Sequence, residues 1–155
     1  LVAAQSTPLL ALGPLFVIWF GPGAAAKIAI CALISLFPIA ISTLVAVRDA
    51  DPGILELYRS LGASRLQLLV EARLPAARAG IFAGARVAAT LAVVGAIVGE
   101  WLGGSVGLGV LINLARGSLF DTPLLFATLV QIAILGVGAY AVVVVAERLS
   151  SRPSR

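Results

Sequence analysis

Apolar stretches long enough to cross a lipid bilayer, which takes about 20 residues of helix, dominate this chain. Most of its charged residues fall in one central passage, residues 51–75, and at the C-terminus. With 61% hydrophobic and 12% charged residues, the chain is far more apolar than a soluble domain. We therefore expect a single all-α domain over residues 1–155, a polytopic membrane helix bundle. Its expected spans are residues 1–20, 24–47, 78–102 and 123–145.

The polar passage predicts two short amphipathic helices. Asp51 can cap a first helix that begins at Pro52, because a proline there gives up an N–H group that would lack a helical partner anyway. Helical spacing places the apolar residues of this helix on one stripe, made of Ile54, Leu57, Tyr58 and Leu61.

Gly62 and Ser64 predict a sharp corner between the two helices. A glycine just after a helix tolerates the left-handed conformation that closes it. Ser64 with Gln67 three residues later is a capping box, which opens the second helix. We expect that helix to end near Leu74, since Pro75 disfavours the helical conformation for the residue before it. Its apolar side comprises Leu66, Leu69 and Val70.

Four positions of this passage resemble a known loop: Glu56, Gly62, Leu74 and Pro75. Their spacing is that of the E-A-A-x3-G-x9-I-x-L-P loop of the integral membrane subunits of ABC importers, without insertions. The content differs at Leu57 and Tyr58, which replace two alanines, and at Ala72, which replaces isoleucine. Flanking segments resemble the permeases of the nitrate, sulfonate, taurine and pyrimidine-precursor group. These segments are Pro14-Leu15-Phe16-Val17-Ile18-Trp19-Phe20-Gly21, Phe37-Pro38-Ile39, Gly62-Ala63-Ser64-Arg65, and Gly99-Glu100-Trp101 before Gly107-Leu108-Gly109.

The resemblance implies a type I permease of an ABC importer in the bacterial cytoplasmic membrane, with residues 51–75 as a cytoplasmic coupling loop for an ATPase subunit. The loop positions so implicated are Glu56, Leu57, Tyr58, Gly62, Ala63, Ala72, Leu74 and Pro75. Further implied partners are an extracytoplasmic solute-binding protein, a second permease subunit and membrane lipid. ATP is bound by the ATPase subunit, so no cofactor is expected in this chain. The family has additional N-terminal helices, so we expect a truncated chain that lacks its first spans.

The same passage also fits an interfacial amphipathic hairpin that lies on lipid headgroups. Such surface helices need no glycine corner, which favours a docking function for Gly62.

Small residues recur at three- and four-residue intervals along residues 78–102, so one stripe of this span is nearly bare backbone. They are Gly80, Gly84, Ala88, Ala92, Gly95 and Gly99, with Gly103 just beyond. Stripes of this kind let membrane helices approach closely. The stripe serves packing within the subunit, or it lines the subunit interface or the translocation path.

Two charged residues lie in or near this span and need an explanation, because charge at membrane depth is costly. Arg86 can snorkel to the cytoplasmic end, or it faces the path. Glu100 and Trp101 precede a glycine-rich loop with Gly107 and Gly109, and the resemblance places all four at the external mouth. The alternative for Glu100 and Trp101 is an interfacial anchor.

The distribution of basic residues predicts the orientation. One side of the spans carries Arg48, Arg59, Arg65, Arg73, Arg78, Arg148, Arg152 and Arg155, and the other carries Lys27 and Arg116. Because cytoplasmic loops are enriched in Lys and Arg, the passage 51–75 and the C-terminus are expected in the cytoplasm.

The composition argues against several other functions. There is no histidine, the lone Cys31 lies in an apolar run, and the seven carboxylates are scattered. We therefore expect no metal site, no catalytic residues and no enzymatic activity. The arginines flank apolar spans and form no patch with interleaved aromatic residues, so no nucleic-acid partner is expected.

The expected function is the translocation of a small solute. The sequences around Leu57 and Glu100 most resemble permeases for thiamine-precursor pyrimidines or riboflavin, with nitrate, sulfonate or taurine next. The alternative is a membrane scaffold or inactive fragment without transport activity.

Overall fold

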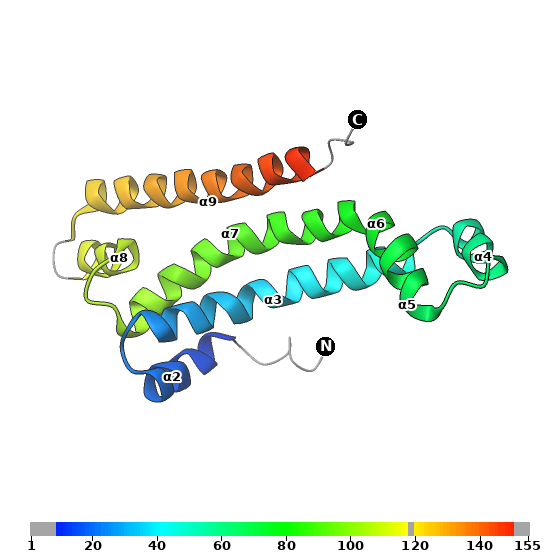
Figure 1. Ribbon diagram of the computed structural model, residues 1–155. Coiled ribbons are helices and arrows are strands. Elements are labelled where there is room, and N and C mark those ends of the chain that lie inside the picture. Colours follow the sequence, from blue (N-terminus) through cyan, green and yellow to red (C-terminus); the bar gives the residue numbers. More distant parts are fainter. Residues whose placement is uncertain (1–8, 118–119, 151–155) are drawn as a thin grey trace.

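The computed structural model describes residues 9–117 and 120–150, and every regular element in these residues is helical (Figure 1). The elements are α2 (Leu9–Phe20), α3 (Ala24–Arg48), α4 (Pro52–Ser60), α5 (Arg65–Gln67), the π-helix η1 (Leu68–Arg73), α6 (Leu74–Ala76), α7 (Arg78–Gly103), α8 (Leu108–Arg116) and α9 (Thr122–Ser150). The all-α fold expected from the sequence is confirmed.

Three helices, α3, α7 and α9, are long and apolar enough to span a membrane, with 25, 26 and 29 residues. They cover the expected spans at 24–47, 78–102 and 123–145. The first expected span, 1–20, lies partly outside the described residues. Its described part, α2, has 12 residues, or about 18 Å of helix, which is shorter than a bilayer core.

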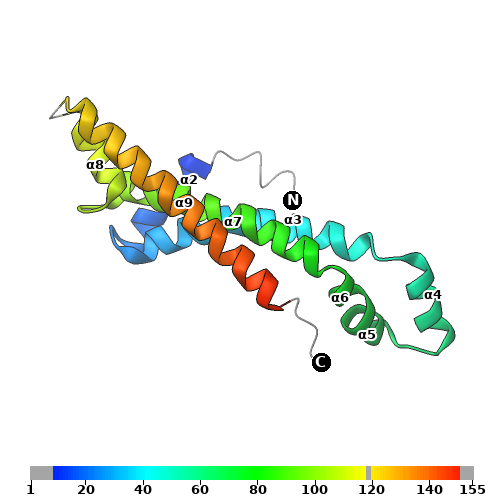
Figure 2. The ribbon, with the colours of Figure 1, turned by 90° about the horizontal axis from the view of Figure 1, so that it is seen from above.

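The long helix α7 lies between α3 and α9 and runs antiparallel to both (Figure 1). Seen from above, α9 crosses α7 at an angle, whereas α3 follows α7 closely (Figure 2). The short helices α4, α5 and α6 extend from the end of the bundle where α9 finishes. We call this the hairpin end, and α2 and α8 lie at the opposite end (Figure 1).

The small-residue stripe of α7 packs against α3 along almost the whole length of both helices. A methyl group added at Gly84 would lie 2.8 Å from the Pro38 carbonyl oxygen, and one at Gly95 would lie 3.2 Å from the Cα of Cys31. Two side chains of α3 also donate to α7 carbonyls: the Ser35 hydroxyl to Ala88 at 3.3 Å and the Cys31 thiol to Ala92 at 3.4 Å. The stripe therefore packs against α3 within the chain.

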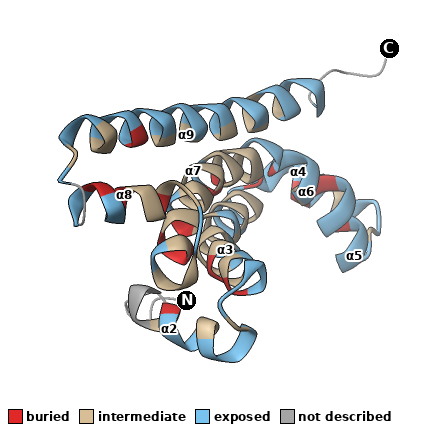
Figure 3. Ribbon diagram, turned by 90° about the vertical axis from the view of Figure 1, so that its left-hand side faces the viewer, coloured by how far each residue is buried: buried red, intermediate tan, exposed pale blue. Residues whose placement is uncertain are grey.

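One group of buried residues lies where α3 meets α7, and others lie in the short helices α4, η1 and α8. By contrast, α9 is exposed over most of its surface (Figure 3). Methyl groups added at Gly136 or Gly138 of α9 would contact nothing within 4 Å. The glycines of α7 and α9 thus differ in role. Those of α7 allow the backbones of α7 and α3 to approach closely, whereas those of α9 face open space.

Gly84→Ala is expected to destabilise the protein by about 1–3 kcal/mol, because the new methyl group forces the α3 and α7 backbones apart. The matched control is Gly138→Ala, which fills open space in a helix and should leave the melting temperature unchanged or slightly higher. Thermal unfolding of the detergent-solubilised protein measures both. A larger loss for Gly138→Ala than for Gly84→Ala would contradict this packing.

Candidate functional site

The connection between α3 and α7 folds into a compact two-helix unit, residues 49–77, which we call the coupling hairpin. Its first helix, α4, begins as the sequence predicts. The Asp51 carboxylate accepts a hydrogen bond from the Gly53 N–H at 2.8 Å, and Pro52 occupies the first helical turn. The negative charge of Asp51 also interacts favourably with the positive end of the helix dipole.

Gly62 makes the corner that ends α4. Its φ is +78°, in the left-handed region that favours glycine. The Gly62 N–H donates to the Arg59 carbonyl and the Ala63 N–H to the Tyr58 carbonyl, both at 3.0 Å. These two bonds form a Schellman motif, so the last carbonyls of α4 are satisfied by the turn itself.

The second helix opens with the predicted capping box. The Gln67 N–H donates to the Ser64 hydroxyl at 3.3 Å, and the Ser64 N–H donates to the Gln67 side-chain oxygen at 2.8 Å. Both bonds are local, so the start of this helix does not depend on the rest of the fold.

The expected end of this helix near Leu74 is wrong. The chain continues through the π-helix η1 and then α6, and Leu74 itself is helical. The Leu74 N–H donates to the Leu69 carbonyl, five residues earlier, as in a π-helix. This wider turn changes the hydrogen-bond ladder just before Pro75, whose ring would clash with the carbonyl four residues earlier in a regular α-helix. The π-helix thus carries helical backbone past Pro75.

The two helices of the hairpin pack on each other through a small core. Its members are Ala50, Leu55, Leu68 and Ala72, with Tyr58 packed against them. Of the apolar stripes expected from the sequence, only Tyr58 joins this core. The others lie on the surface: Ile54, Leu57, Leu61, Leu66, Leu69 and Val70. The hairpin therefore buries one apolar face and presents another.

Charged residues near these leucines in the sequence are exposed too. Leu61 and Leu66 are 76% and 70% exposed, and Glu56, Arg59 and Arg65 are exposed as well. Large exposed apolar side chains rimmed by polar ones mark interaction surfaces. Ala63 lies just before the second helix and Leu74 lies exposed in α6, whereas Ala72 of η1 is buried in the hairpin core.

Glu100 has a structural partner at the opposite end of the bundle. Its carboxylate accepts a hydrogen bond from the Gly109 N–H at 2.6 Å, at the start of α8. Gly107 has φ +137°, and a methyl group there would overlap the Glu100 carboxylate. The structure thus brings together Glu100, Gly107 and Gly109, while Trp101 is 44% exposed beside them. Glu100 holds the glycine-rich loop against α7.

Arg86 forms an ion pair that sequence reasoning missed. Its Nη1 lies 3.5 Å from the Glu147 carboxylate, and the two side chains are 30% and 24% exposed. The expected span ends at residue 145, but α9 remains helical to Ser150 and brings Glu147 alongside α7. The two residues are 61 positions apart, so no local pattern signals their contact. Nowhere in residues 9–117 and 120–150 do three His, Cys, Asp or Glu residues gather as metal ligands would.

Comparison with known proteins gives consistent matches along the chain. Residues 1–155 match the protein family described as binding-protein-dependent transport system inner membrane component. The riboflavin transport system permease protein RibX of Chloroflexus aurantiacus is 43% identical over 152 residues, which are 98% of this chain and 56% of that protein. The formylaminopyrimidine transport permease protein ThiX of Halalkalibacterium halodurans is 36% identical, over 92% of this chain and 57% of that protein.

A third relative is the putative aliphatic sulfonates transport permease protein SsuC of Escherichia coli. It is 38% identical over 85% of this chain and 50% of its own length. The chain thus spans about half the length of the curated relatives that it matches. No solved structure matches it.

Glu100→Ala is expected to lower stability by about 1.5–3 kcal/mol, because the variant loses a hydrogen bond to a charged group at the start of α8. Glu100→Gln keeps an oxygen that can accept from the Gly109 N–H and should lose less. Melting temperatures of the two variants check this order. Equal losses would show that the hydrogen bond to Gly109 does not hold the loop.

Proposed function

Since the chain belongs to the family of inner membrane components of binding-protein-dependent transport systems, we propose that it works as the permease subunit of an ABC importer and docks onto an ATPase subunit through the coupling hairpin. The observation that carries this proposal is the exposed face of the hairpin, with Leu61 and Leu66 at its corner. The ATPase subunit binds ATP, and this chain needs no cofactor of its own.

The position of the hairpin supports a protein partner over a lipid surface. In two perpendicular views, α4 lies beyond the ends of α3 and α7 (Figures 1 and 2). A hairpin that lay on headgroups would instead spread sideways from the ends of the spans, with its apolar face toward the bilayer. The hairpin reaches away from the spans, as docking in a groove of a cytoplasmic subunit requires.

The hairpin is connected to the spans in a way that transmits force. From Arg65 to Gly103 the backbone is helical with only a turn at Ala77, which is fully buried. α7 is in turn packed backbone to backbone against α3. We infer that a displacement of the hairpin, driven by ATP-dependent closure of two ATPase subunits, moves α3 and α7 as one body. Such a body can rock between inward-facing and outward-facing states.

Basic residues support the orientation of this unit. The described residues of the hairpin end carry seven arginines, six near the helix ends and one inside α7: Arg48, Arg59, Arg65, Arg73, Arg78 and Arg148, with Arg86 inside α7. Lys27 and Arg116 lie at the opposite end. By the positive-inside rule, the hairpin end and the C-terminus face the cytoplasm of a bacterial cell. Glu100 and Trp101 then lie near the external mouth, where a solute-binding protein delivers the solute to a permease dimer in the lipid bilayer.

The names of the relatives support a small solute as cargo. They describe transport of riboflavin, formylaminopyrimidine and aliphatic sulfonates. We propose a riboflavin-type or pyrimidine-type solute first and a sulfonate, taurine or nitrate second. A non-transporting scaffold is the alternative outcome of the tests below.

Gly62→Val is expected to abolish co-purification of the ATPase subunit with the complete permease. A β-branched residue at φ +78° is strained, so the corner between the two hairpin helices must change. Gly136→Val, at a glycine with open space around it, is the control and should retain the ATPase. Retention by Gly62→Val would count against the hairpin as the docking element.

Leu61→Glu tests the exposed face without disturbing the backbone. Leu61 is 76% exposed, so the fold should tolerate the change, while loss of a central apolar contact weakens ATPase binding by about ten-fold or more. Val106→Glu is a matched control, because Val106 is equally exposed at the opposite end. Affinity is measured with purified permease and ATPase. Equal effects of the two variants would favour the scaffold or a lipid-bound hairpin.

A further inference from the structure

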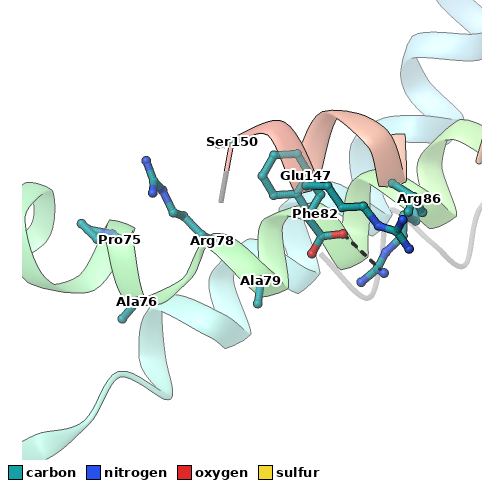
Figure 4. Close-up of a pocket in the computed structure, with 10 residues that line it drawn as sticks. Pro75, Ala76, Arg78, Ala79, Phe82, Arg86, Glu147 and Ser150 are labelled. Carbon is teal, nitrogen blue, oxygen red and sulfur yellow. Dashed lines mark ion pairs between the residues drawn. The ribbon is translucent and has the colours of Figure 1, made fainter. Parts of the chain in front are cut away.

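A groove runs between the first turns of α7 and the last turns of α9, with α6 at its edge (Figure 4). Its volume is about 540 Å³. The groove lies at the hairpin end of the bundle, but its walls are the spans and not the exposed face of the hairpin. It is therefore separate from the docking surface described above.

Positive charge is in excess in this groove. Arg78 and Arg86 of α7 and Arg148 of α9 line it, against a single carboxylate from Glu147. Glu147 points toward Arg86, with which it pairs at 3.5 Å, whereas Arg78 extends away from that pair (Figure 4). Three arginines and one glutamate give the groove a net charge of two positive, which suits an anionic ligand.

The remaining wall is apolar. Phe82, Ala79 and Val144 line the groove between the charged groups, and Pro75 closes the side toward α6. A small soluble anion such as phosphate would leave this wall uncovered. A ligand with a phosphate at one end and hydrocarbon at the other would satisfy both parts.

The level of the groove along the spans fits such an amphiphile. The apolar sequence of α9 ends at its first charged residue, Glu147. Because Glu147 pairs with Arg86, Arg86 of α7 lies at the same depth along the spans. A helix leaves the hydrocarbon layer where its charged residues begin, which is where lipid phosphates lie. Basic pockets between spans at this depth are suited to anionic headgroups.

We propose that this groove binds an anionic phospholipid, with the phosphate held by the arginines and the hydrocarbon against Phe82. A bound lipid would tie the end of α9 to α7, beside the Arg86–Glu147 pair that also joins the two helices. The contact between α9 and the pair α3 and α7 would then depend on the lipid composition of the membrane.

Native mass spectrometry of the complete permease with phosphatidylglycerol or phosphatidylcholine tests this proposal. We expect tighter binding of phosphatidylglycerol, weakened about five-fold by Arg78→Gln or Arg148→Gln and restored by Arg78→Lys. Arg48→Gln is the control, since Arg48 is an exposed arginine at the same end that does not line the groove. This control should bind phosphatidylglycerol as the unchanged protein does.

Two further arms identify the ligand. Inorganic phosphate and glycerol phosphate at the same concentration should not displace phosphatidylglycerol, since neither covers the apolar wall. A photoreactive benzoylphenylalanine placed at Ala79 should label lipid. Equal binding of the two lipids, displacement by inorganic phosphate, an equal loss in Arg48→Gln, or labelling of polypeptide in place of lipid would each overturn the proposal.

Discussion

The close approach of the α3 and α7 backbones is the interaction on which the rest of this structure depends. In a bilayer, hydrocarbon offers apolar helices no hydrophobic gain from association, so contact must come from packing and from weak polar bonds. Glycines and alanines on α7 supply this contact from Gly99 beside Lys27 to Gly80 beside Ala46. The hydrogen bonds from Ser35 and Cys31 reinforce it midway.

The helix pair α3 and α7 determines the position of the hairpin. It joins the end of α3 at Arg48 to the start of α7 at Arg78, so the two spans fix both of its ends. Within it, the Gly62 corner and the core around Leu55 and Leu68 set the angle between the two short helices. The π-helix then continues into α6 and α7 without a loop. A unit anchored in this way can transmit a displacement of a docked subunit to the spans.

Local sequence patterns predicted much of this arrangement, and contacts between distant residues account for what they missed. Asp51, Gly62 and the Ser64–Gln67 pair act within one turn of their own positions, and the spacing of glycines along residues 78–102 reports directly on one helix face. The inward face of the hairpin depends on the angle at the corner. Helical spacing alone therefore predicts an apolar stripe of leucines that the structure exposes, and it does not single out Leu55 and Leu68.

Three further features have no signal in the local sequence. The π-helix arises from a shift in the hydrogen-bond ladder ahead of Pro75, whereas the rule for prolines predicts an end to the helix. The Arg86–Glu147 pair joins residues 61 positions apart. Glu100 was assigned to the external mouth from resemblance, and the structure adds its hydrogen bond to Gly109, which depends on how the loop after α7 turns back.

The central claim is that the hairpin, α7 and α3 move as one body when the ATPase subunits close. The most direct measurement is the distance between spin labels at Ser60 and Val94 of one chain, in the complete transporter with and without ATP and in a Cys31→Ala background. We predict that this distance stays constant while the distance between the Ser60 labels of the two permease subunits changes. A change in the distance within one chain that follows ATP binding would contradict the account.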